Sequence, residues 1–434
     1  MNTGQSSPCI WGELIFITGS DESSKTLNMY AIKRETGALE WKRDLKVDSL
    51  EQVHRVSHQA NATPVTDGER VVFYFGSYGL LCLDYEGNLL WDYPMSVPET
   101  VHGMGTSPVI AGDLVLLNCL GQINDPCLLA INKIDGSLVW KYTSDIREGE
   151  LVDSYSTPVI HNHRAIIYRS RDVAAYDLDS GKQIWTYPAR LGDAVCTPVI
   201  GDDLLFVTFF STLGNPSAIE QFPDFHQLCE LYDSNEDRKL AKEEIAGFTW
   251  LNYPEKSDIA DTLNMGDWFS FWDQNRDEWI DSAEYEGINQ YCQSFYEKQG
   301  IKAIRLGGSG EIGMDHFAWG NPDHVPHVTS PLYLDGRVYE IKSGGILSCF
   351  KANDGRLLFR ERIGAAGTYF ASPVAAGDRI YFAARNGVIT VVEAGDSMVV
   401  VSRTDLGEII SATPAIVDNK IYIRTEESLY AFGE

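Results

Sequence analysis

The sequence predicts an all-β fold, an eight-bladed β-propeller of four-stranded blades, with a small α-helical insertion in blade five. The main observation is a short phrase of a small residue, Ser or Thr, Pro and an apolar pair that occurs eight times. Its prolines are Pro8, Pro64, Pro108, Pro158, Pro198, Pro331, Pro373 and Pro414. All but one of the intervals between successive prolines lie between 40 and 56 residues, the length of one propeller blade. The exceptional interval, from Pro198 to Pro331, marks the insertion.

The strands of one blade are clearest in the third copy, which runs SPVIAGDLVLLNCLG and then LLAINKIDGSLVWKYT. It contains four short apolar runs separated by turn signals, as four antiparallel strands require. A large aromatic residue stands four positions after the glycine of the last turn in most copies. The series is Trp41, Trp91, Trp140, Trp185 and Phe359, weakening to Val399. We interpret these side chains as core residues that seal one blade against the next.

The fifth copy is interrupted. Its first two strands end at Phe210, and the segment IKAIRLGGSGEIGMDHFAW supplies the missing third and fourth strands, with Trp319 as the aromatic. The chain therefore divides into blades one to five (first half) at 1–210, an insertion at 211–300, and blades five (second half) to eight at 301–434.

The eighth copy has no fourth strand before Glu434, and only MNTGQ precedes the first copy. Either the ring closes imperfectly, or a natural N-terminal segment with the closing strand, and with a signal peptide, is absent from this sequence. We favour the second explanation.

Composition restricts the classes of partner. A hydrophobic content of 44% indicates a folded protein, and a net charge of −27 argues against nucleic-acid binding. No apolar stretch is long enough to span a membrane. Of the eight cysteines, Cys82 and Cys349 occupy equivalent strand positions and are expected in the core, whereas the spacing of Cys119 and Cys127 leaves open whether they are bridged.

The insertion contains two similar acidic loops, DSNEDRKLAKEE at 233–244 and DQNRDEWIDSAE at 273–284. Each has Asp, Asn and Asp at positions 1, 3 and 5, an aliphatic residue at 8 and Glu at 12, and together they resemble an EF-hand pair that binds Ca²⁺. The resemblance implies a ligand set of Asp233, Asn235, Asp237, the Lys239 carbonyl and Glu244 in the first loop. The second set is Asp273, Asn275, Asp277, the Trp279 carbonyl, Asp281 at position 9 and Glu284.

The segments around these loops support the resemblance. Apolar residues recur at helical spacing before the first loop and after the second, and Leu240 and Ile280 are expected to pair between the loops. The usual glycine at position 6 is replaced by Arg238 and Glu278. A residue with a side chain in that left-handed conformation costs about 1–2 kcal/mol, so occupancy of both sites is left open. The second loop has more acidic ligands, and we expect it to bind more tightly.

A partner site is expected on the face that carries the insertion, because the loop between the second and third strands and the connection to the next blade leave a blade on the same side. Candidate funnel residues in these connections are His58, His102, Tyr155, His327 and Tyr369. Scattered His and Tyr side chains also serve simply to hydrogen-bond loops, and that explanation stays open. A funnel of this kind is a normal site for a small molecule or a peptide.

The phrases MYAIKRETGALEW, LLAINKIDGSLVW and VAAYDLDSGKQIW resemble the repeat of the pyrroloquinoline-quinone (PQQ) type propellers. That superfamily includes quinoprotein alcohol dehydrogenases and a propeller of the outer-membrane assembly machinery. A narrower resemblance, in SSPCIWGELIFITG and ATPAIVDNKIYIRTEESLYAFG, is to exported bacterial proteins with inserted EF-hands. The dehydrogenases hold their quinone against adjacent cysteines, which this sequence lacks, so PQQ is not expected here.

The combined expectation is a non-catalytic binding or scaffolding protein rather than an enzyme. It would recognise a protein or glycan partner on the insert-bearing face, use Ca²⁺ to order the insertion, act as a monomer, and be periplasmic or extracellular. The alternative is a divergent quinoprotein (PQQ-dependent) dehydrogenase or another enzyme with its site in the funnel. No residue pattern identifies a catalytic group.

Overall fold

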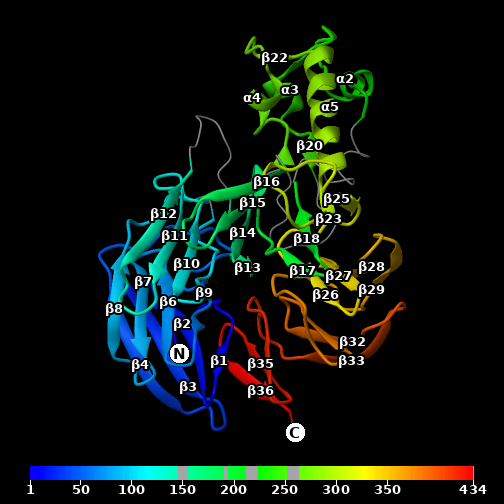
Figure 1. Cartoon of the computed structure of the whole chain (residues 1–434). Coiled ribbons are helices and arrows are strands. Elements are labelled where there is room, and N and C mark those ends of the chain that lie inside the picture. Colours follow the sequence, from blue (N-terminus) through cyan, green and yellow to red (C-terminus); the bar gives the residue numbers. More distant parts are fainter. Residues whose placement is uncertain (101, 145–153, 190–193, 212–222, 252–262, 434) are drawn as a thin grey trace.

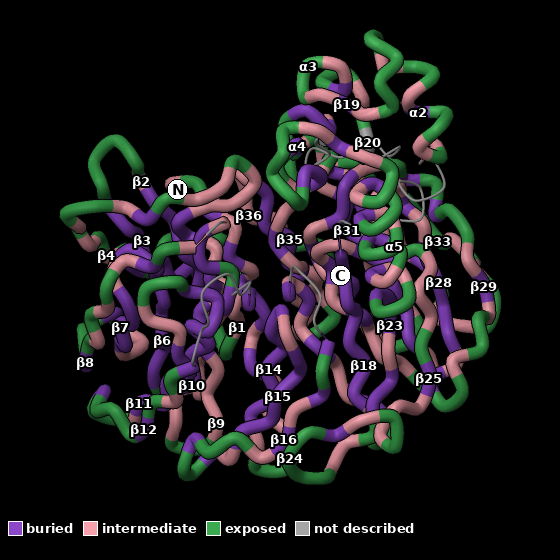
Figure 2. The backbone as a smooth tube through the Cα atoms, turned by 90° about the horizontal axis from the view of Figure 1, so that it is seen from above, coloured by how far each residue is buried: buried purple, intermediate pink, exposed green. Residues whose placement is uncertain are grey.

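The computed structural model places eight antiparallel sheets in a ring around a central axis, with the insertion standing on one face (Figure 1). It describes residues 1–100, 102–144, 154–189, 194–211, 223–251 and 263–433. Figure 2 shows the molecule turned by 90° from the view of Figure 1: buried residues concentrate along the two middle strands of the blades, the innermost strands are mostly half-buried, and exposed residues lie in turns and outer strands. The predicted eight-bladed, all-β propeller is confirmed.

The first four blades follow the predicted order of strands, from the axis outwards. Blade one comprises β1 (Cys9–Trp11), β2 (Leu14–Asp21), β3 (Thr26–Lys33) and β4 (Leu39–Lys46). Blade two comprises β5 (Val65–Thr66), β6 (Arg70–Phe75), β7 (Gly79–Asp84) and β8 (Leu89–Pro94). Blade three comprises β9 (Val109–Ala111), β10 (Leu114–Cys119), β11 (Cys127–Asn132) and β12 (Leu138–Thr143). Blade four comprises β13 (Val159–His161), β14 (Arg164–Arg169), β15 (Asp172–Asp177) and β16 (Gln183–Pro188).

The remaining blades include the interrupted one. Blade five comprises β17 (Val199–Gly201), β18 (Leu204–Phe209), β23 (Gly300–Arg305) and β25 (Phe317–Asn321). Blade six comprises β26 (Leu332–Leu334), β27 (Arg337–Lys342), β28 (Ile346–Lys351) and β29 (Leu357–Arg362). Blade seven comprises β30 (Val374–Ala376), β31 (Arg379–Ala383), β32 (Val388–Glu393) and β33 (Val399–Asp405). Blade eight comprises β34 (Ala415–Val417), β35 (Lys420–Arg424) and β36 (Leu429–Phe432).

The described residues of the insertion form helices of 4 to 17 residues and two small β-ribbons. Its helices are α2 (Phe225–Tyr232), α3 (Lys242–Ile245), α4 (Phe269–Trp272) and α5 (Ser282–Lys298). Its ribbons pair β19 (Leu240–Ala241) with β22 (Trp279–Ile280), and β20 (Thr249–Leu251) with β21 (Leu263–Asn264). It begins after β18 and ends at β23, where Phe209 pairs directly with Gly300. The two strands that flank the insertion are therefore direct neighbours in the sheet of blade five.

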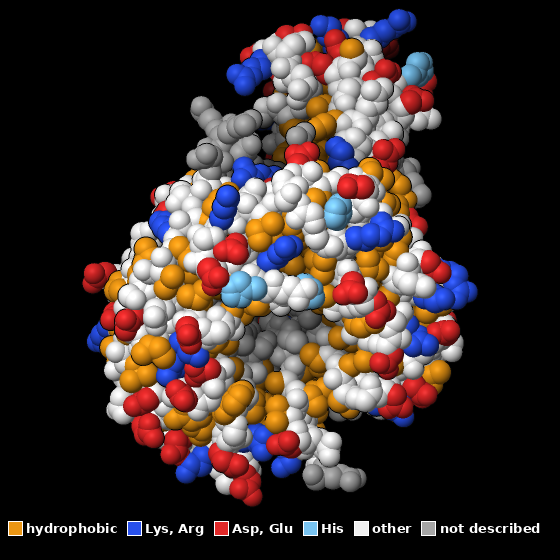
Figure 3. All heavy atoms as spheres, viewed as in Figure 1, with side chains coloured by type: hydrophobic (Ala, Val, Ile, Leu, Met, Phe, Trp, Pro, Cys, Tyr) orange, Lys and Arg blue, Asp and Glu red, His pale blue; other side chains and the backbone are white. Residues whose placement is uncertain are grey.

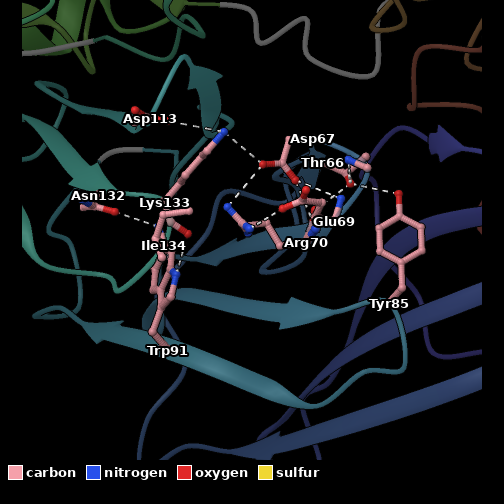
Figure 4. Close-up of polar contacts among 11 residues, drawn as sticks. Thr66, Asp67, Glu69, Arg70, Tyr85, Trp91, Asp113, Asn132, Lys133 and Ile134 are labelled. Carbon is pink, nitrogen blue, oxygen red and sulfur yellow. Dashed lines mark hydrogen bonds and ion pairs between the residues drawn. The ribbon is translucent and has the colours of Figure 1, made fainter.

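The predicted blade-end aromatics are core residues that dock on the neighbouring blade. Trp91 is 6% exposed, and its Nε1–H donates to the carbonyl oxygen of Lys133 at 2.9 Å (Figure 4). Trp41, Trp140 and Trp319 make equivalent bonds to Tyr85, Leu178 and Ala352. A glycine lies beneath each of these rings; a Cβ on Gly181, for example, would approach the ring of Trp140 to 2.4 Å. The glycine of the turn thus makes room for the indole.

Salt bridges supplement this contact between blades two and three. The Lys133 ammonium group lies 3.2 Å from the carboxylate of Asp67 and 3.8 Å from that of Asp113 (Figure 4). Asp67 also accepts from the backbone of Arg70 at 3.1 Å and lies 3.4 Å from its guanidinium group. Charged groups in the turns therefore reinforce the apolar seal.

The eight Ser/Thr-Pro phrases form a closed circle of hydrogen bonds near the axis, which we call the hydroxyl ring. It comprises Ser7, Thr63, Ser107, Thr157, Thr197, Ser330, Ser372 and Thr413. The backbone N–H of each member donates to the side-chain oxygen of the member in the next blade, and Thr413 donates to Ser7, with every distance between 2.9 and 3.2 Å. The proline that follows each member favours an extended backbone for it, because its ring clashes with a helical predecessor.

Blade eight closes on blade one through the hydroxyl ring and a buried arginine. The Arg424 guanidinium group is 4% exposed and donates to the Ser6 carbonyl at 3.1 Å, the Ser6 hydroxyl at 2.5 Å and the Thr18 carbonyl at 2.6 Å. Burial lowers the pKa of Arg424 to about 10. The charge is therefore retained at neutral pH and is stabilised by neutral oxygen acceptors.

Two features depart from the regular repeat. The turn between the last two strands of blade five is a longer segment, in which β24 (Gly310–Glu311) pairs parallel with β16 of blade four. Trp185, the blade-end aromatic of blade four, is 1% exposed, and its Nε1 has no hydrogen-bond partner within the described chain.

Blade eight has three strands among the described residues, and a Cβ on Gly37 of blade one would meet nothing within 4 Å. Among the described residues, therefore, no aromatic ring lies over Gly37 as one does over the equivalent glycines of other blades.

The hydroxyl ring predicts that removing one oxygen destabilises the whole propeller. Replacing Thr157 by Val keeps the branched shape but leaves the Ser107 N–H without its acceptor, which should lower the free energy of unfolding by about 1–3 kcal/mol. Thr157→Ser retains the oxygen and should lose less. Urea denaturation followed by tryptophan fluorescence measures both variants, and equal losses for Val and Ser would contradict the role assigned to the hydroxyl group.

Candidate functional site

The second acidic loop of the insertion brings three carboxylates together. Asp273, Asp277 and Glu284 each offer an oxygen, and these oxygens lie within 4.8 Å of one another. This is the one such group of three acidic, His or Cys side chains in the described residues, and the corresponding carboxylates of the first loop do not meet the same criterion. The arrangement is suited to a hard cation, which prefers several oxygen ligands.

The two loops nevertheless share one pattern of internal hydrogen bonds. In the second loop, Asp273 accepts from the backbone N–H groups of Asp277 at 3.1 Å and Glu278 at 3.0 Å. In the first loop, Asp233 accepts in the same way from residues 237 and 238, at 3.3 and 2.8 Å. Asn275 accepts from the Asp277 N–H at 2.7 Å, and residue 235 repeats this bond at 2.9 Å. The side chains at positions 1 and 3 are therefore turned into both loops.

The sharp turn expected at position 6 is present without glycine. Arg238 and Glu278 have φ values of 63° and 70°, in the left-handed region. The residues at position 4, Glu236 and Arg276, also have positive φ values of 61° and 62°. Four side-chain-bearing residues thus adopt a conformation that normally favours glycine, as a loop with inward-facing ligands requires.

Glu284 belongs both to the loop and to the helix that follows it. It lies in the first turn of α5, and its two carboxylate oxygens accept from the N–H groups of Asn275 at 2.9 Å and Asp281 at 3.2 Å. Asp281, a predicted ligand, caps α5 by accepting the Glu284 N–H at 2.9 Å. The last ligand position is therefore fixed by the start of a 17-residue helix.

The predicted pairing of Leu240 with Ile280 is present and joins the two loops back to back. Both side chains are fully buried, in a cluster that also contains Trp272 and Tyr285. Lys239 adds a longer ion contact to the other loop, with its Nζ 3.8 Å from Asp277. The side chains of Lys239 and Trp279 were not expected to bind metal, since their predicted ligands are backbone carbonyls.

The far end of α5 is fastened to the propeller. The Tyr296 hydroxyl donates to the Asp323 carboxylate at 2.6 Å, and the Gln299 amide donates to the Pro322 carbonyl at 3.3 Å. Phe295 packs in the core cluster of blades four and five. Residues 322 and 323 belong to the connection that leads to His327. The insertion and the blade-to-blade connections thus lie on the same face, as predicted, and α5 links them (Figure 1).

Two of the predicted funnel residues lie together. The ring of His102 is 5.8 Å from that of Tyr155, and His54 joins them with its ring 5.2 Å from His102. These aromatic rings come from the connections that enter blades two, three and four. They form an edge-to-face row that we call the aromatic row.

The other three predicted funnel residues are separate from this row. His58 lines a cavity of about 550 Å³ with residues 1–3 and 20–23, and its Nδ1 accepts the Ala60 N–H at 3.1 Å. Burial lowers the pKa of His58 to about 4, so it is neutral at pH 7. His327 stacks on Phe210 with ring centroids 4.0 Å apart. Tyr369 is 2% exposed and donates to the Ala365 carbonyl at 2.8 Å, so it fills the role of a loop-bonding core residue.

Sequence reasoning missed two buried acids near this face. Glu51 is 3% exposed and accepts the Met104 N–H at 3.2 Å, and a Cβ on Gly76 would fall 2.4 Å from its carboxylate. Glu340 is also 3% exposed and accepts a hydrogen bond from Thr208. Burial raises the pKa of each to about 7. The signal for Glu340 was a charged residue inside the apolar strand RVYEIK; Glu51 lies in a connection and gave none.

On the face seen in Figure 3, negatively charged side chains are not gathered into a single patch. Asp and Glu side chains are spread over the propeller and over the tip of the insertion (Figure 3). No helix among the described residues is both long and apolar enough to cross a membrane.

Comparison with known proteins supports the propeller repeat but identifies no functional residues. A family model described as "Outer membrane protein assembly factor BamB" matches residues 8–212, which span blades one to four and the start of blade five. No curated protein sequence matches the chain. The match confirms the recognition of PQQ-like propeller repeats in residues 8–212, whereas the narrower resemblance to exported proteins with inserted EF-hands stays a prediction.

Three solved structures share the fold at low sequence identity. BamB from Moraxella catarrhalis is 13% identical with a TM-score of 0.56, and the alignment covers 99% of this chain and 94% of that one. The computationally designed Ika8 protein is 9% identical with a TM-score of 0.59, covering 100% and 97%. A europium-containing methanol dehydrogenase is 12% identical with a TM-score of 0.58, covering 98% and 82%. At these identities the likeness establishes the propeller alone.

The raised pKa of Glu51 predicts a pH-dependent stability. The folded protein holds the Glu51 proton more tightly than the unfolded chain does. The contribution of Glu51 to the free energy of unfolding is therefore fully present below about pH 4.5, decreases as the pH rises to about 7, and is constant above that pH. The slope in that window should be about 1.4 kcal/mol per pH unit for this group. Glu51→Gln should remove this part of the decline in urea titrations between pH 4.5 and 8. The exposed Glu86→Gln is the matched control, and an unchanged slope in Glu51→Gln would refute the assignment.

Proposed function

We propose that this protein is a non-catalytic binding or scaffolding propeller that carries a calcium-binding EF-hand pair. It would recognise a protein or glycan partner on the insert-bearing face, formed by the insertion and the connections between blades. The observation that carries the proposal is the convergence of Asp273, Asp277 and Glu284, with oxygens within 4.8 Å of one another in a loop of EF-hand spacing.

Three further features support calcium as the cation. Both loops turn Asp and Asn side chains inwards, and both adopt positive φ at positions 4 and 6. The paired ribbon of β19 and β22 joins them as two halves of one unit. Carboxylate and amide oxygens from alternate positions of a tight loop are the ligands that Ca²⁺ prefers. The closer carboxylates of the second loop support tighter binding there than in the first.

The role proposed for calcium is structural. Without a cation, Asp273, Asp277 and Glu284 repel one another, and binding would relieve that repulsion at the start of α5. The other end of α5 is bonded to Asp323 through Tyr296, four residues before His327. A bound cation would therefore stiffen the support of the insertion on the face where the partner is expected.

The proposal of a binding role draws on the family likeness. The matching family model carries the name of an assembly factor, and one structural neighbour is BamB. From these relatives we transfer to this protein only the general role of a protein-binding propeller. Export to the periplasm or the cell exterior is proposed on the same likeness, and a monomeric state is proposed because each blade finds its neighbours within one chain.

The alternative is a divergent quinoprotein dehydrogenase or another enzyme with its site in the funnel. Its support is the fold likeness to a methanol dehydrogenase, which is 12% identical. The sequence has no adjacent cysteine pair to support a quinone. The aromatic row and Glu51 offer titratable groups near the funnel, but no predicted set of catalytic residues converges on them. We therefore do not favour this alternative.

Calcium binding is tested by calorimetry. Titration of the metal-free protein should give binding heat that is lost, or weakened at least tenfold in affinity, in Glu284→Gln, and less affected in Glu244→Gln. Glu286→Gln is the matched control, since this exposed residue lies half a turn further along α5 and outside the loop. Absence of heat in the wild type, or its persistence in Glu284→Gln, would rule out the assigned site.

The enzymatic alternative is tested by adding PQQ together with Ca²⁺ and an alcohol. We expect no stoichiometric change in quinone absorbance and no reduction of an artificial electron-accepting dye. A saturable absorbance change with alcohol-dependent dye reduction would overturn the non-catalytic assignment.

A further inference from the structure

Two cysteines lie directly opposite each other in blade three. Cys119 is the last residue of β10 and Cys127 the first of β11, and they are register partners at the end of the antiparallel pair. Both are 0% exposed and belong to the same core cluster. Both thiols are free in this structure. Residues opposite each other in an antiparallel pair have Cα atoms about 4.5–5.5 Å apart, inside the range of about 4.4–6.8 Å that a disulfide spans.

The pairing is specific to these two residues. Cys82 faces Val72 and Trp91 across its sheet, and Cys349 faces Tyr339 and Phe359. Within the described strands, no other cysteine lies opposite a second one. The Cys127 thiol, together with burial, also holds the pKa of the Cys119 thiol well above its usual range, as expected for two neighbouring thiols.

We propose that Cys119 and Cys127 form a cross-strand disulfide when the chain folds under oxidising conditions. The bond closes the base of the segment 120–126 between β10 and β11. The sequence left this pairing open, because spacing alone does not place two cysteines opposite each other. The register of blade three supplies the missing geometry.

The disulfide would influence the insert-bearing face by restraining segment 120–126. The Ile123 N–H donates to the Glu99 carbonyl at 2.9 Å, and the Asn124 amide donates to the Val97 carbonyl at 3.0 Å. Asn124 also accepts the Glu99 N–H at 3.2 Å. These bonds hold the connection that continues to His102 in the aromatic row. Closing the base of 120–126 would therefore restrain one wall of the proposed partner site.

The chemistry is a thiol–disulfide exchange with a small external disulfide such as oxidised glutathione. One thiolate attacks the external disulfide and releases one reduced thiol, and the second cysteine then attacks the mixed disulfide and releases the other. The two cysteines lose two electrons and two protons, and the external disulfide becomes two thiols. Because the neighbouring Cys127 and burial hold the pKa of Cys119 well above its usual range, the folded protein should react slowly, so the bond should form during folding.

The experiment is refolding of the denatured, reduced protein in a buffer of reduced and oxidised glutathione. Remaining thiols are then alkylated under denaturing conditions and counted by mass spectrometry. We expect two of the eight cysteines to escape alkylation. Cleavage before Asp125, which separates Cys119 from Cys127 in the reduced chain, should leave the two fragments joined until a reductant is added.

Two variants make the result decisive. Cys119→Ala should leave every remaining thiol alkylated, whereas Cys82→Ala, a buried cysteine of the same core cluster, should still lose two. A reductant should lower the Tm of the oxidised wild type and of Cys82→Ala by several degrees and leave that of Cys119→Ala unchanged. Complete alkylation of the refolded wild type, or a bridge between other cysteines, would overturn the proposal. Calcium titration of the same samples reports separately on the proposed function.

Discussion

The hydroxyl ring is the constraint on which the rest of the propeller depends. Each Ser or Thr accepts from one neighbour and donates through its backbone to the other, so every blade is fixed on both sides near the axis. The circle includes the step from Thr413 to Ser7, which no peptide bond provides. Arg424 adds three hydrogen bonds at the same junction, and their neutral acceptors allow a buried charge without a carboxylate. Ring closure therefore uses polar groups as well as apolar packing.

Farther from the axis, the indole contacts complete the inter-blade packing. The aromatic side chain of one blade meets a glycine and a carbonyl of the next, as Trp140 does with Gly181 and Leu178. Neither the hydroxyl ring nor the indole contacts use residues of the loops between second and third strands. It is there that blade five carries its insertion, and there that the segment 120–126 supports the connection to His102. The parts of the chain that differ from blade to blade are concentrated on one face.

Repeated features of the fold were predictable from the sequence, and isolated ones were not. Eight Pro phrases revealed the blades, and the long interval revealed the insertion, because repetition averages over local irregularity. The hydroxyl ring itself was not predicted, since the phrase shows a Ser or Thr but not its partner some forty residues away. The loops at 233–244 and 273–284 were located by spacing, and the positive φ at their position 6 was expected from the chemistry of a tight turn, whereas the positive φ at position 4 was not predicted. The predicted grouping of the funnel residues was only partly correct, since His102 and Tyr155 lie together but His58, His327 and Tyr369 do not. Residues in long connections have no periodicity from which their positions could be predicted. Glu51 and Glu340 depend on burial, which only the packed structure reveals.

The antiparallel pairing of Phe209 with Gly300 has a further consequence for how such a fold acquires new parts. The chain leaves blade five and returns to it at neighbouring positions. For the sheet, the insertion is therefore equivalent to a loop whose two ends are already held together. The entropic cost of closing a flexible loop rises slowly with its length, by about 0.6 kcal/mol of free energy for each doubling. An insertion that folds by itself reduces even that cost. The end of a propeller hairpin is therefore a position where a whole folded module can be accepted with little loss of stability, and the ring need not change to accommodate it.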